Sequence, residues 1–128
     1  MSVRDITVII TSFRSGEKIK SCLNSIDRKI KVLLIENSND SNIKKNIEKE
    51  FSNVECILTG ANFGYGKSNN IGLKKVLTKY ALILNPDATL HPTAIKNFIK
   101  MIQIYSFFIV LLVFIANWPV LFPLHALT

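Results

Sequence analysis

Short apolar runs alternate along this chain with segments whose apolar residues recur at helical spacing. The apolar runs are rich in β-branched residues and lie at residues 6–11, 30–35, 54–58 and 81–84. Short runs of this kind, bounded by turn residues, are typical of buried strands in a parallel sheet. The pattern therefore predicts a sheet of four parallel strands.

The segments between and after these runs carry apolar residues three and four positions apart, which predicts amphipathic helices. Proline suits the first position of a helix, so the last helix is predicted to begin at Pro92. Strands and helices then alternate, which predicts one α/β domain with a Rossmann-like parallel sheet and right-handed crossovers. The predicted inward-facing helix residues are Ile19, Cys22, Leu23, Ile26, Ile43, Ile47, Phe51, Leu73, Val76, Leu77, Tyr80, Ala94, Ile95, Phe98, Ile99 and Ile102.

The last part of the chain differs from the rest. Residues 101–128 contain no Lys, Arg, Asp or Glu, so we expect a domain at residues 1–101 and an apolar tail at residues 102–128. The charge-free stretch is long enough for a bilayer, which needs roughly 20 apolar residues. Three interpretations of the tail stay open: a segment that spans or lies on a membrane, a segment buried in the fold, and a non-native continuation after truncation or a frame change.

Composition adds a preference for anionic partners. The net charge of +7 is carried entirely by the first hundred residues and suits a phosphorylated small molecule or an anionic membrane face. Most of the lysines lie on predicted polar helix faces, however, so an ordinary solvated surface is the simpler interpretation. No RNP-type, zinc-spacing or helix-turn-helix pattern is present, so we expect no nucleic-acid partner. Cys22 and Cys56 fall on predicted apolar faces, as reduced core cysteines do. Together with an N-terminus that lacks a signal-peptide profile, they predict a cytoplasmic protein, attached to the inner face of the membrane if the tail inserts.

Polar residues follow the second and fourth predicted strands, at the ends where open α/β sheets bind ligands. Asn85 and Asp87 follow the fourth strand, and one carboxylate with one amide oxygen suits a divalent cation that also takes ligands from substrate phosphates. Glu36 and Asn37 follow the second strand, and a carboxylate there can accept a pyrimidine N–H or ribose hydroxyls. The alternatives are a simple turn at residues 85–87 and helix capping after Glu36.

A glycine-rich loop at residues 59–67 joins the third strand to the next helix. Its end, Gly66-Lys67-Ser68, matches a phosphate-binding P-loop, but that motif requires glycine where this chain has Ala61. The dinucleotide pattern G-x-G-x-x-G also fails, because Asn69 stands in the third glycine position. A flexible turn is the simplest interpretation, and a P-loop-type nucleotide binder is a weaker alternative.

Several segments carry a combined pattern in unbroken order: residues 8–13, 22–26, 35–40, 62–66, 69–73 and 84–88. Together they resemble the nucleotide-sugar-binding half of family 2 glycosyltransferases with the GT-A fold, and within them the rhamnosyltransferase-like branch. By this resemblance the chain would be a truncated GT-A fold that binds a nucleoside-diphosphate sugar.

The resemblance also implies which residues bind the donor. Thr11, Ser12 and Phe13 would line the base pocket. Glu36, where the family more often has aspartate, would hold the base or the ribose. Residues 62, 64 and 70 would border the nucleotide. Residues 85–87 stand at the family's Asp-X-Asp motif, so Asp87 would contact Mg²⁺ or Mn²⁺. The full implied set is Thr11, Ser12, Phe13, Glu36, Asn37, Asn62, Gly64, Asn70, Asn85 and Asp87.

The implied reaction is inverting transfer of a sugar to a hydroxyl of a glycan or lipid-linked acceptor, as in cell-wall or polysaccharide biosynthesis. The metal would stabilise charge on the departing diphosphate, and a carboxylate base would take the acceptor's proton. In the family that base lies in the second half of the domain, so we expect no catalytic residue here and little or no transfer by this chain alone. The competing hypothesis is a membrane-associated protein without catalytic activity, either a remnant or a binding module.

Overall fold

The computed structural model describes residues 2–105 and 112–113. A short 3-10 helix, η1 (Val3–Asp5), precedes the first strand. The strands are β1 (Ile6–Ser12), β2 (Lys31–Glu36), β3 (Val54–Leu58), β4 (Tyr80–Leu84) and β5 (Leu112–Val113). The helices are α1 (Glu17–Asn24), α2 (Ser41–Glu50), α3 (Tyr65–Lys74) and α4 (Ala94–Tyr105). The alternation of strand and helix predicted from the sequence is thereby confirmed.

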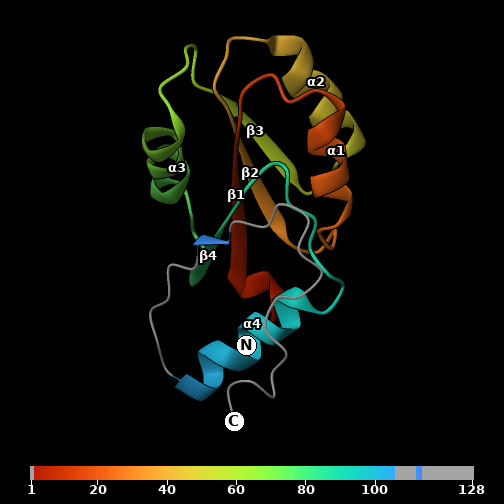
Figure 1. The fold of residues 1–128 in the computed structure, drawn as a ribbon, viewed down its shortest axis with the longest axis vertical. Coiled ribbons are helices and arrows are strands. Elements are labelled where there is room, and N and C mark those ends of the chain that lie inside the picture. Colours follow the sequence, from red (N-terminus) through yellow and green to blue (C-terminus); the bar gives the residue numbers. More distant parts are fainter. Residues whose placement is uncertain (1, 106–111, 114–128) are drawn as a thin grey trace.

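The strands form one parallel sheet in the order β3-β2-β1-β4-β5 (Figure 1). The chain proceeds from β1 outward to β3 on one side, and β4 then pairs with the opposite side of β1. Because all strands are parallel, their carboxyl ends lie at the same edge of the sheet. The reversal of strand order beside β1 is the position at which such sheets usually bind ligands.

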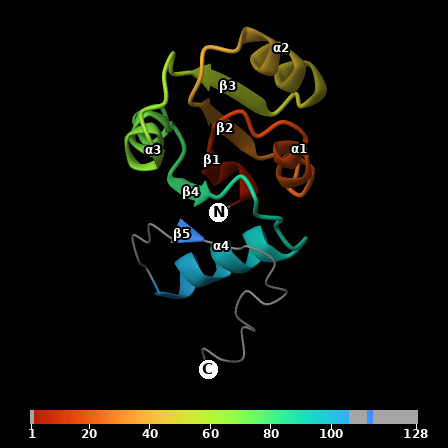
Figure 2. The same cartoon turned by 45° about the horizontal axis from the view of Figure 1, so that its top comes forward.

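Helices cover both faces of this sheet, with α1 and α2 on one face and α3 on the other (Figure 2). Successive side chains of the central strand therefore enter different apolar clusters. Val8 and Ile10 of β1 pack in the cluster that includes residues of α1, α2 and α4. Ile9 packs in the second cluster, to which the half-buried Leu73 of α3 contributes. All seven residues of β1 are buried, as expected for the central strand.

Gly72 allows α3 to lie close against the sheet. A Cβ atom at this position would lie 2.7 Å from Cγ2 of Ile9 and 3.3 Å from Cγ1 of Ile35. No side chain fits there without movement of β1 or of α3, because Ile9 is fully buried. This contact fixes the height of α3 above β1 and β2.

Three details of the predicted helices are wrong. Tyr80, predicted to continue the apolar stripe of the third helix, is instead the first residue of β4. Leu77, predicted to face inward, is 93% exposed, because α3 ends at Lys74 and the helical spacing does not continue. The side chain of Thr78 instead pairs with that of Thr7 in β1 at 2.7 Å, which holds the following turn against the sheet. Pro92 precedes the last helix and does not begin it, since α4 starts at Ala94.

The predicted tail at residues 102–128 falls mostly outside the described residues. Helix α4 continues past the expected boundary at residue 101 and ends at Tyr105. Two tail residues form β5, whose register pairs Ile83 with Leu112. In the part of the chain that the structure describes, no helix is both long and apolar enough to cross a membrane.

Candidate functional site

The carboxyl ends of β1 and β2 are joined by a buried carboxylate. Ser12 Oγ donates a hydrogen bond to Glu36 Oε2 at 2.5 Å, and the backbone N–H of Arg14 donates to Glu36 Oε1 at 3.0 Å. Glu36 is only 1% exposed, so these bonds offset the cost of its burial. Arg14 adopts a positive φ of 48°, which is uncommon for a residue other than glycine. Glu36 thus holds the turn after β1, in which Phe13 is 52% exposed.

The side chain of Asn37 connects the end of β2 to the glycine-rich loop. Its Nδ2 donates to the carbonyl oxygen of Gly64 at 3.3 Å, and its Oδ1 accepts from Ser68 Oγ at 2.5 Å. Thr59 Oγ1 also lies 3.2 Å from the same Oδ1. Asn37 and Ser68 are both buried, so the first turn of α3 is tied directly to the end of β2.

A second buried bond ties α3 to β1. Thr11 Oγ1 donates to Asn69 Oδ1 at 2.8 Å, and both residues are 5% exposed. Ser68 and Asn69 were not among the predicted site residues. Gly72 follows Ser68 by four positions and Asn69 by three, so all three residues share one face of a helix. This spacing is the sequence signal that could have identified Ser68 and Asn69.

The burial of Ser68 also removes the P-loop interpretation. In that motif the corresponding hydroxyl binds a nucleotide-bound metal ion and must face the ligand. Here Ser68 is 0% exposed and its hydroxyl donates to Asn37.

The loop before α3 is exposed on its outer side. Gly60 and Gly64 have φ angles of 84° and 81°, a conformation that glycine adopts without strain. Asn62 Oδ1 accepts a hydrogen bond from the backbone N–H of Gly64 at 3.1 Å, which closes a tight turn. Phe63 is 43% exposed, and Lys67 Nζ lies 4.4 Å from the centre of its ring. Asn70, predicted to border the nucleotide, is likewise exposed.

The end of β4 forms a polar turn with an exposed carboxylate. Asn85 Oδ1 accepts from the backbone N–H of Asp87 at 3.3 Å, and the backbone N–H of Ala88 donates to the Asn85 carbonyl at 2.9 Å. The thiol of Cys22 donates to the same carbonyl at 3.7 Å. Burial, and then the negative charge of Asp87, raise the pKa of the Cys22 thiol to about 12. Asp87 therefore lies close to α1 at this edge.

Asp87 alone does not form a complete metal site. Among the described residues, no group of three or more His, Cys, Asp or Glu side chains could hold a metal ion. Mg²⁺ in nucleotide sites, however, is commonly bound through one or two carboxylates plus substrate phosphates. The donor set of Asp87 and Asn85 fits such an ion when a diphosphate supplies further oxygens.

Glu36 and Asp87 lie at the same edge of the sheet. Their strands, β2 and β4, flank β1 on its two sides and run parallel to it. The predicted convergence of these two strand ends on one edge is therefore confirmed. The direct contacts with a base, a ribose or a metal that were predicted for the individual residues stay predictions.

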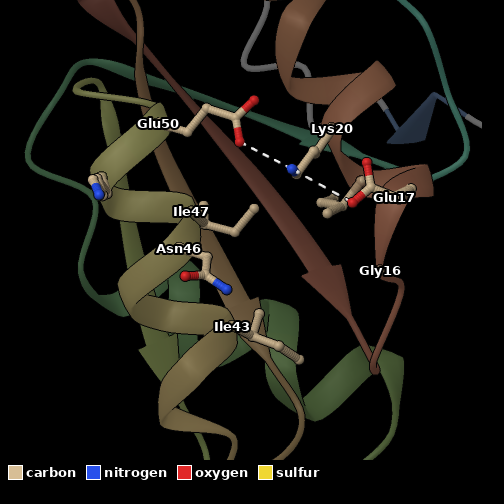
Figure 3. A pocket seen from close by; sticks show the side chains of 9 residues that line it. Gly16, Glu17, Lys20, Ile43, Asn46, Ile47 and Glu50 are labelled. Atoms are coloured by element: carbon tan, nitrogen blue, oxygen red, sulfur yellow. Dashed lines mark ion pairs between the residues drawn. The ribbon is translucent and has the colours of Figure 1, made fainter.

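A groove elsewhere in the molecule contains none of the predicted site residues. It lies between α1 and α2, has a volume of about 550 Å³, and includes Ile43 and Ile47 in its lining. Lys20 crosses it, with ion-pair distances of 3.5 Å to Glu17 and 3.1 Å to Glu50 (Figure 3). The first pair lies within α1 and the second links α1 to α2, and solvent-accessible pairs of this kind contribute little to stability.

The chain is also similar to proteins of known function. The low-salt glycan biosynthesis hexosyltransferase Agl10 of Haloferax volcanii is 26% identical over 110 residues, covering 83% of this chain and 35% of that protein. The chain thus spans about a third of the length of this relative.

Solved structures show the same fold. The crystal structure of S. aureus TarS 1–349 in complex with UDP-GlcNAc has a TM-score of 0.67 at 20% identity, over 79% of this chain and 32% of that one. The complex of the same protein with UDP has a TM-score of 0.66 at 21% identity, over 79% and 32% of the two chains.

A sequence model of the family described as Glycosyl transferase family 2 matches residues 7–120, which is most of the chain. The chain therefore belongs to glycosyl transferase family 2.

Proposed function

We propose that this chain binds the nucleoside-diphosphate part of a sugar donor at the carboxyl edge of its sheet. The observation that carries the proposal is the convergence of three polar strand ends and the start of α3 at the switch point beside β1. Membership of glycosyl transferase family 2 supports it. The solved complexes of TarS with UDP-GlcNAc and UDP, which share the fold, support it as well.

The base and ribose would lie over the ends of β1 and β2. Phe13 presents an exposed ring there, on which a planar base can stack. Among the described residues Glu36 accepts two hydrogen bonds, and a carboxylate has about four lone-pair directions. Its free lone pairs would accept the imide N–H of a pyrimidine or a ribose hydroxyl once the turn at Phe13 and Arg14 admits the ligand. Thr11 and Ser12, which are both buried, would form the floor of this site.

The diphosphate would lie between the end of β4 and the exposed loop before α3. Asp87 and Asn85 would hold Mg²⁺ or Mn²⁺ together with the phosphate oxygens, and the ion would offset the charge of the departing diphosphate. Asn62, Gly64 and Asn70 would border the nucleotide from the loop and α3. Lys67, exposed in the first turn of α3, adds positive charge on the same side.

The complete reaction is a further part of the proposal. It is inverting transfer of the sugar to a hydroxyl of a glycan or lipid-linked acceptor, on the cytoplasmic side of the membrane, by an enzyme of the rhamnosyltransferase-like branch. Because the chain spans about a third of its curated relative, we assign donor binding to the described residues and no catalytic base among them. We expect the chain alone to show little or no transfer.

Calorimetric titration of the chain with UDP and dTDP, with and without Mn²⁺, tests donor binding. We expect saturable binding with one site per chain, weaker for ADP because a purine base is larger than the pyrimidine that the pocket would receive. Uridine is the matched control without phosphates and is expected to bind more weakly than UDP. Absence of saturable binding to every diphosphate would contradict the proposal.

A further inference from the structure

We infer that Asn37 is a positioning residue for donor binding, which fixes the loop at residues 59–64 and does not itself touch the nucleotide. The inference rests on the proposed function. It arises because the far end of an exposed loop at the candidate site, at Gly64, is bonded to one buried side chain.

The contacts of Asn37 reach both ends of the loop. At the far end, Nδ2 donates to the Gly64 carbonyl at 3.3 Å, and Ser68 Oγ donates to Oδ1 at 2.5 Å. At the near end, Thr59 Oγ1 lies 3.2 Å from Oδ1 but 2.6 Å from the carbonyl of Ala61. A hydroxyl has one proton, so Thr59 donates mainly to Ala61, and the bonds to Gly64 and Ser68 are the principal contacts of Asn37.

The orientation of the Asn37 amide follows from these partners. If its oxygen and nitrogen exchanged places, the oxygen would face the carbonyl of Gly64, where no proton is present. The orientation with Nδ2 toward Gly64 is therefore the one that satisfies both ends of the amide. Since Asn37 is 3% exposed, its side chain offers almost no surface to a bound nucleotide.

The rest of the loop depends on Asn37 unequally. Its near end is held by backbone bonds that continue the pairing of β2 with β3, from the N–H of Thr59 to the Glu36 carbonyl at 3.0 Å and from the N–H of Gly60 to the Ser38 carbonyl at 3.1 Å. Its far end, at Gly64, has the bond from Asn37 and one backbone bond, from the N–H of Ser68 to the same carbonyl at 3.3 Å. Loss of the Asn37 side chain would thus loosen the far end, with Asn62 and Phe63, and leave the near end in place.

The test combines affinity with amide hydrogen exchange in Asn37→Ala, Ser68→Ala and the control Asn39→Ala, at a temperature at which every variant is folded. Asn39 belongs to the same polar turn but is exposed. In Asn37→Ala we expect UDP to bind about tenfold more weakly, because a change of this size corresponds to the loss of one or two buried hydrogen bonds. Exchange should rise at the amides of Gly64 and Ser68 and stay unchanged at Gly60. Ser68→Ala should also weaken UDP binding and speed amide exchange, but by less. Asn39→Ala should change neither the affinity nor the exchange rates.

The outcomes separate this inference from the proposed function. A wild-type chain that binds neither UDP nor dTDP contradicts the proposed function and, with it, a role in donor binding. Wild-type binding that is retained in Asn37→Ala contradicts the positioning role alone. Weakened binding without faster exchange at Gly64 would indicate direct contact with the ligand and also contradicts it. Asn37→Asp, which keeps the acceptor for Ser68 but cannot donate to Gly64, should show the same changes and serves if Asn37→Ala does not fold.

Discussion

Ser12 and Glu36 are neighbours in the strand register at the carboxyl edge of the sheet, and their side chains are also hydrogen-bonded. The register of β1 and β2 places them side by side, and the Ser12 hydroxyl donates to the Glu36 carboxylate at 2.5 Å. The same carboxylate accepts the backbone N–H of Arg14 at 3.0 Å. The turn that carries Phe13 into the candidate site therefore depends on a side chain of the neighbouring strand.

Replacement of Glu36 by alanine should lower the free energy of unfolding by about 2 kcal/mol, because a buried hydroxyl and a backbone N–H lose their acceptor. Urea denaturation measures this loss. Glu55→Ala is the matched control, since Glu55 pairs with Lys31 on the surface at 3.2 Å and such pairs contribute at most about 1 kcal/mol. Equal losses in the two variants would contradict the structural role of Glu36.

Replacing each of two glycines of α3 by alanine should change the stability of the fold in opposite directions. Gly72→Ala should destabilise the fold by about 1–3 kcal/mol, since the new Cβ would lie 2.7 Å from Ile9 Cγ2. Gly66→Ala, where a Cβ would meet nothing within 4 Å, should stabilise it by about 0.5–1 kcal/mol through helix propensity. Thermal or urea unfolding of both variants provides the comparison. If Gly72→Ala proved as stable as Gly66→Ala, α3 could not lie as close to β1 as described.

The buried thiols should make the fold less stable at alkaline pH. Burial, the largest cause in each case, raises the pKa of Cys22 to about 12 and that of Cys56 to about 11, from an ordinary value of 9.0. The folded chain then retains thiol protons that the unfolded chain loses, so this contribution to stability is intact below pH 9 and decreases between about pH 9 and 12.

Unfolding free energies measured at pH 8, 9, 10 and 10.5 test this dependence. Cys22→Ala should show a shallower decline than the wild-type chain across the same range. The lysines titrate in both proteins, so their effect cancels in the difference. Parallel pH profiles for the two proteins would show that the Cys22 thiol does not have a raised pKa.

Asp87→Asn should affect both metal use and a neighbouring thiol. If Asp87 helps to hold a divalent ion, the increase in UDP affinity on adding Mn²⁺ should largely disappear in this variant. Loss of the negative charge should also lower the pKa of Cys22, which a thiol titration can follow without any nucleotide. Asp27→Asn, in a turn at the opposite edge of the sheet, is the control for both readouts. An unchanged Mn²⁺ effect in Asp87→Asn would remove Asp87 from the metal site.

The strands could be predicted closely because their signal is local. The third predicted strand, residues 54–58, coincides with β3, and the first ends one residue short of β1. Parallel connectivity then places Glu36 and Asp87 at one edge without further information. The end of α3 could not be predicted, because Leu73, Val76 and Leu77 keep helical spacing. The helix nevertheless ends at Lys74, and the chain beyond it is held against the sheet by the pairing of Thr78 with Thr7.

The contacts inside the site could not be predicted either. The sequence indicated a loop up to Lys67, whereas α3 begins at Tyr65 and turns Ser68 and Asn69 toward the sheet. These two partners belong to an element some thirty to sixty residues away from Asn37 and Thr11 in the chain. Thr11 and Asn37, which the family resemblance assigns to the substrate site, thus bond to two side chains that it does not assign, and the sequence alone could not reveal these pairings.

Donor binding at the carboxyl edge of the sheet is tested most directly by mapping the amide shifts of the ¹⁵N-labelled chain during titration with UDP and Mn²⁺. We expect saturable shifts at residues 11–14, 36–38, 60–68 and 85–88, which follow or border the carboxyl ends of the strands. We expect none at residues 27–31 and 52–54, near the amino ends of β2 and β3, or in the groove between α1 and α2. Saturable shifts confined to the amino ends or to that groove would contradict donor binding at the switch point beside β1.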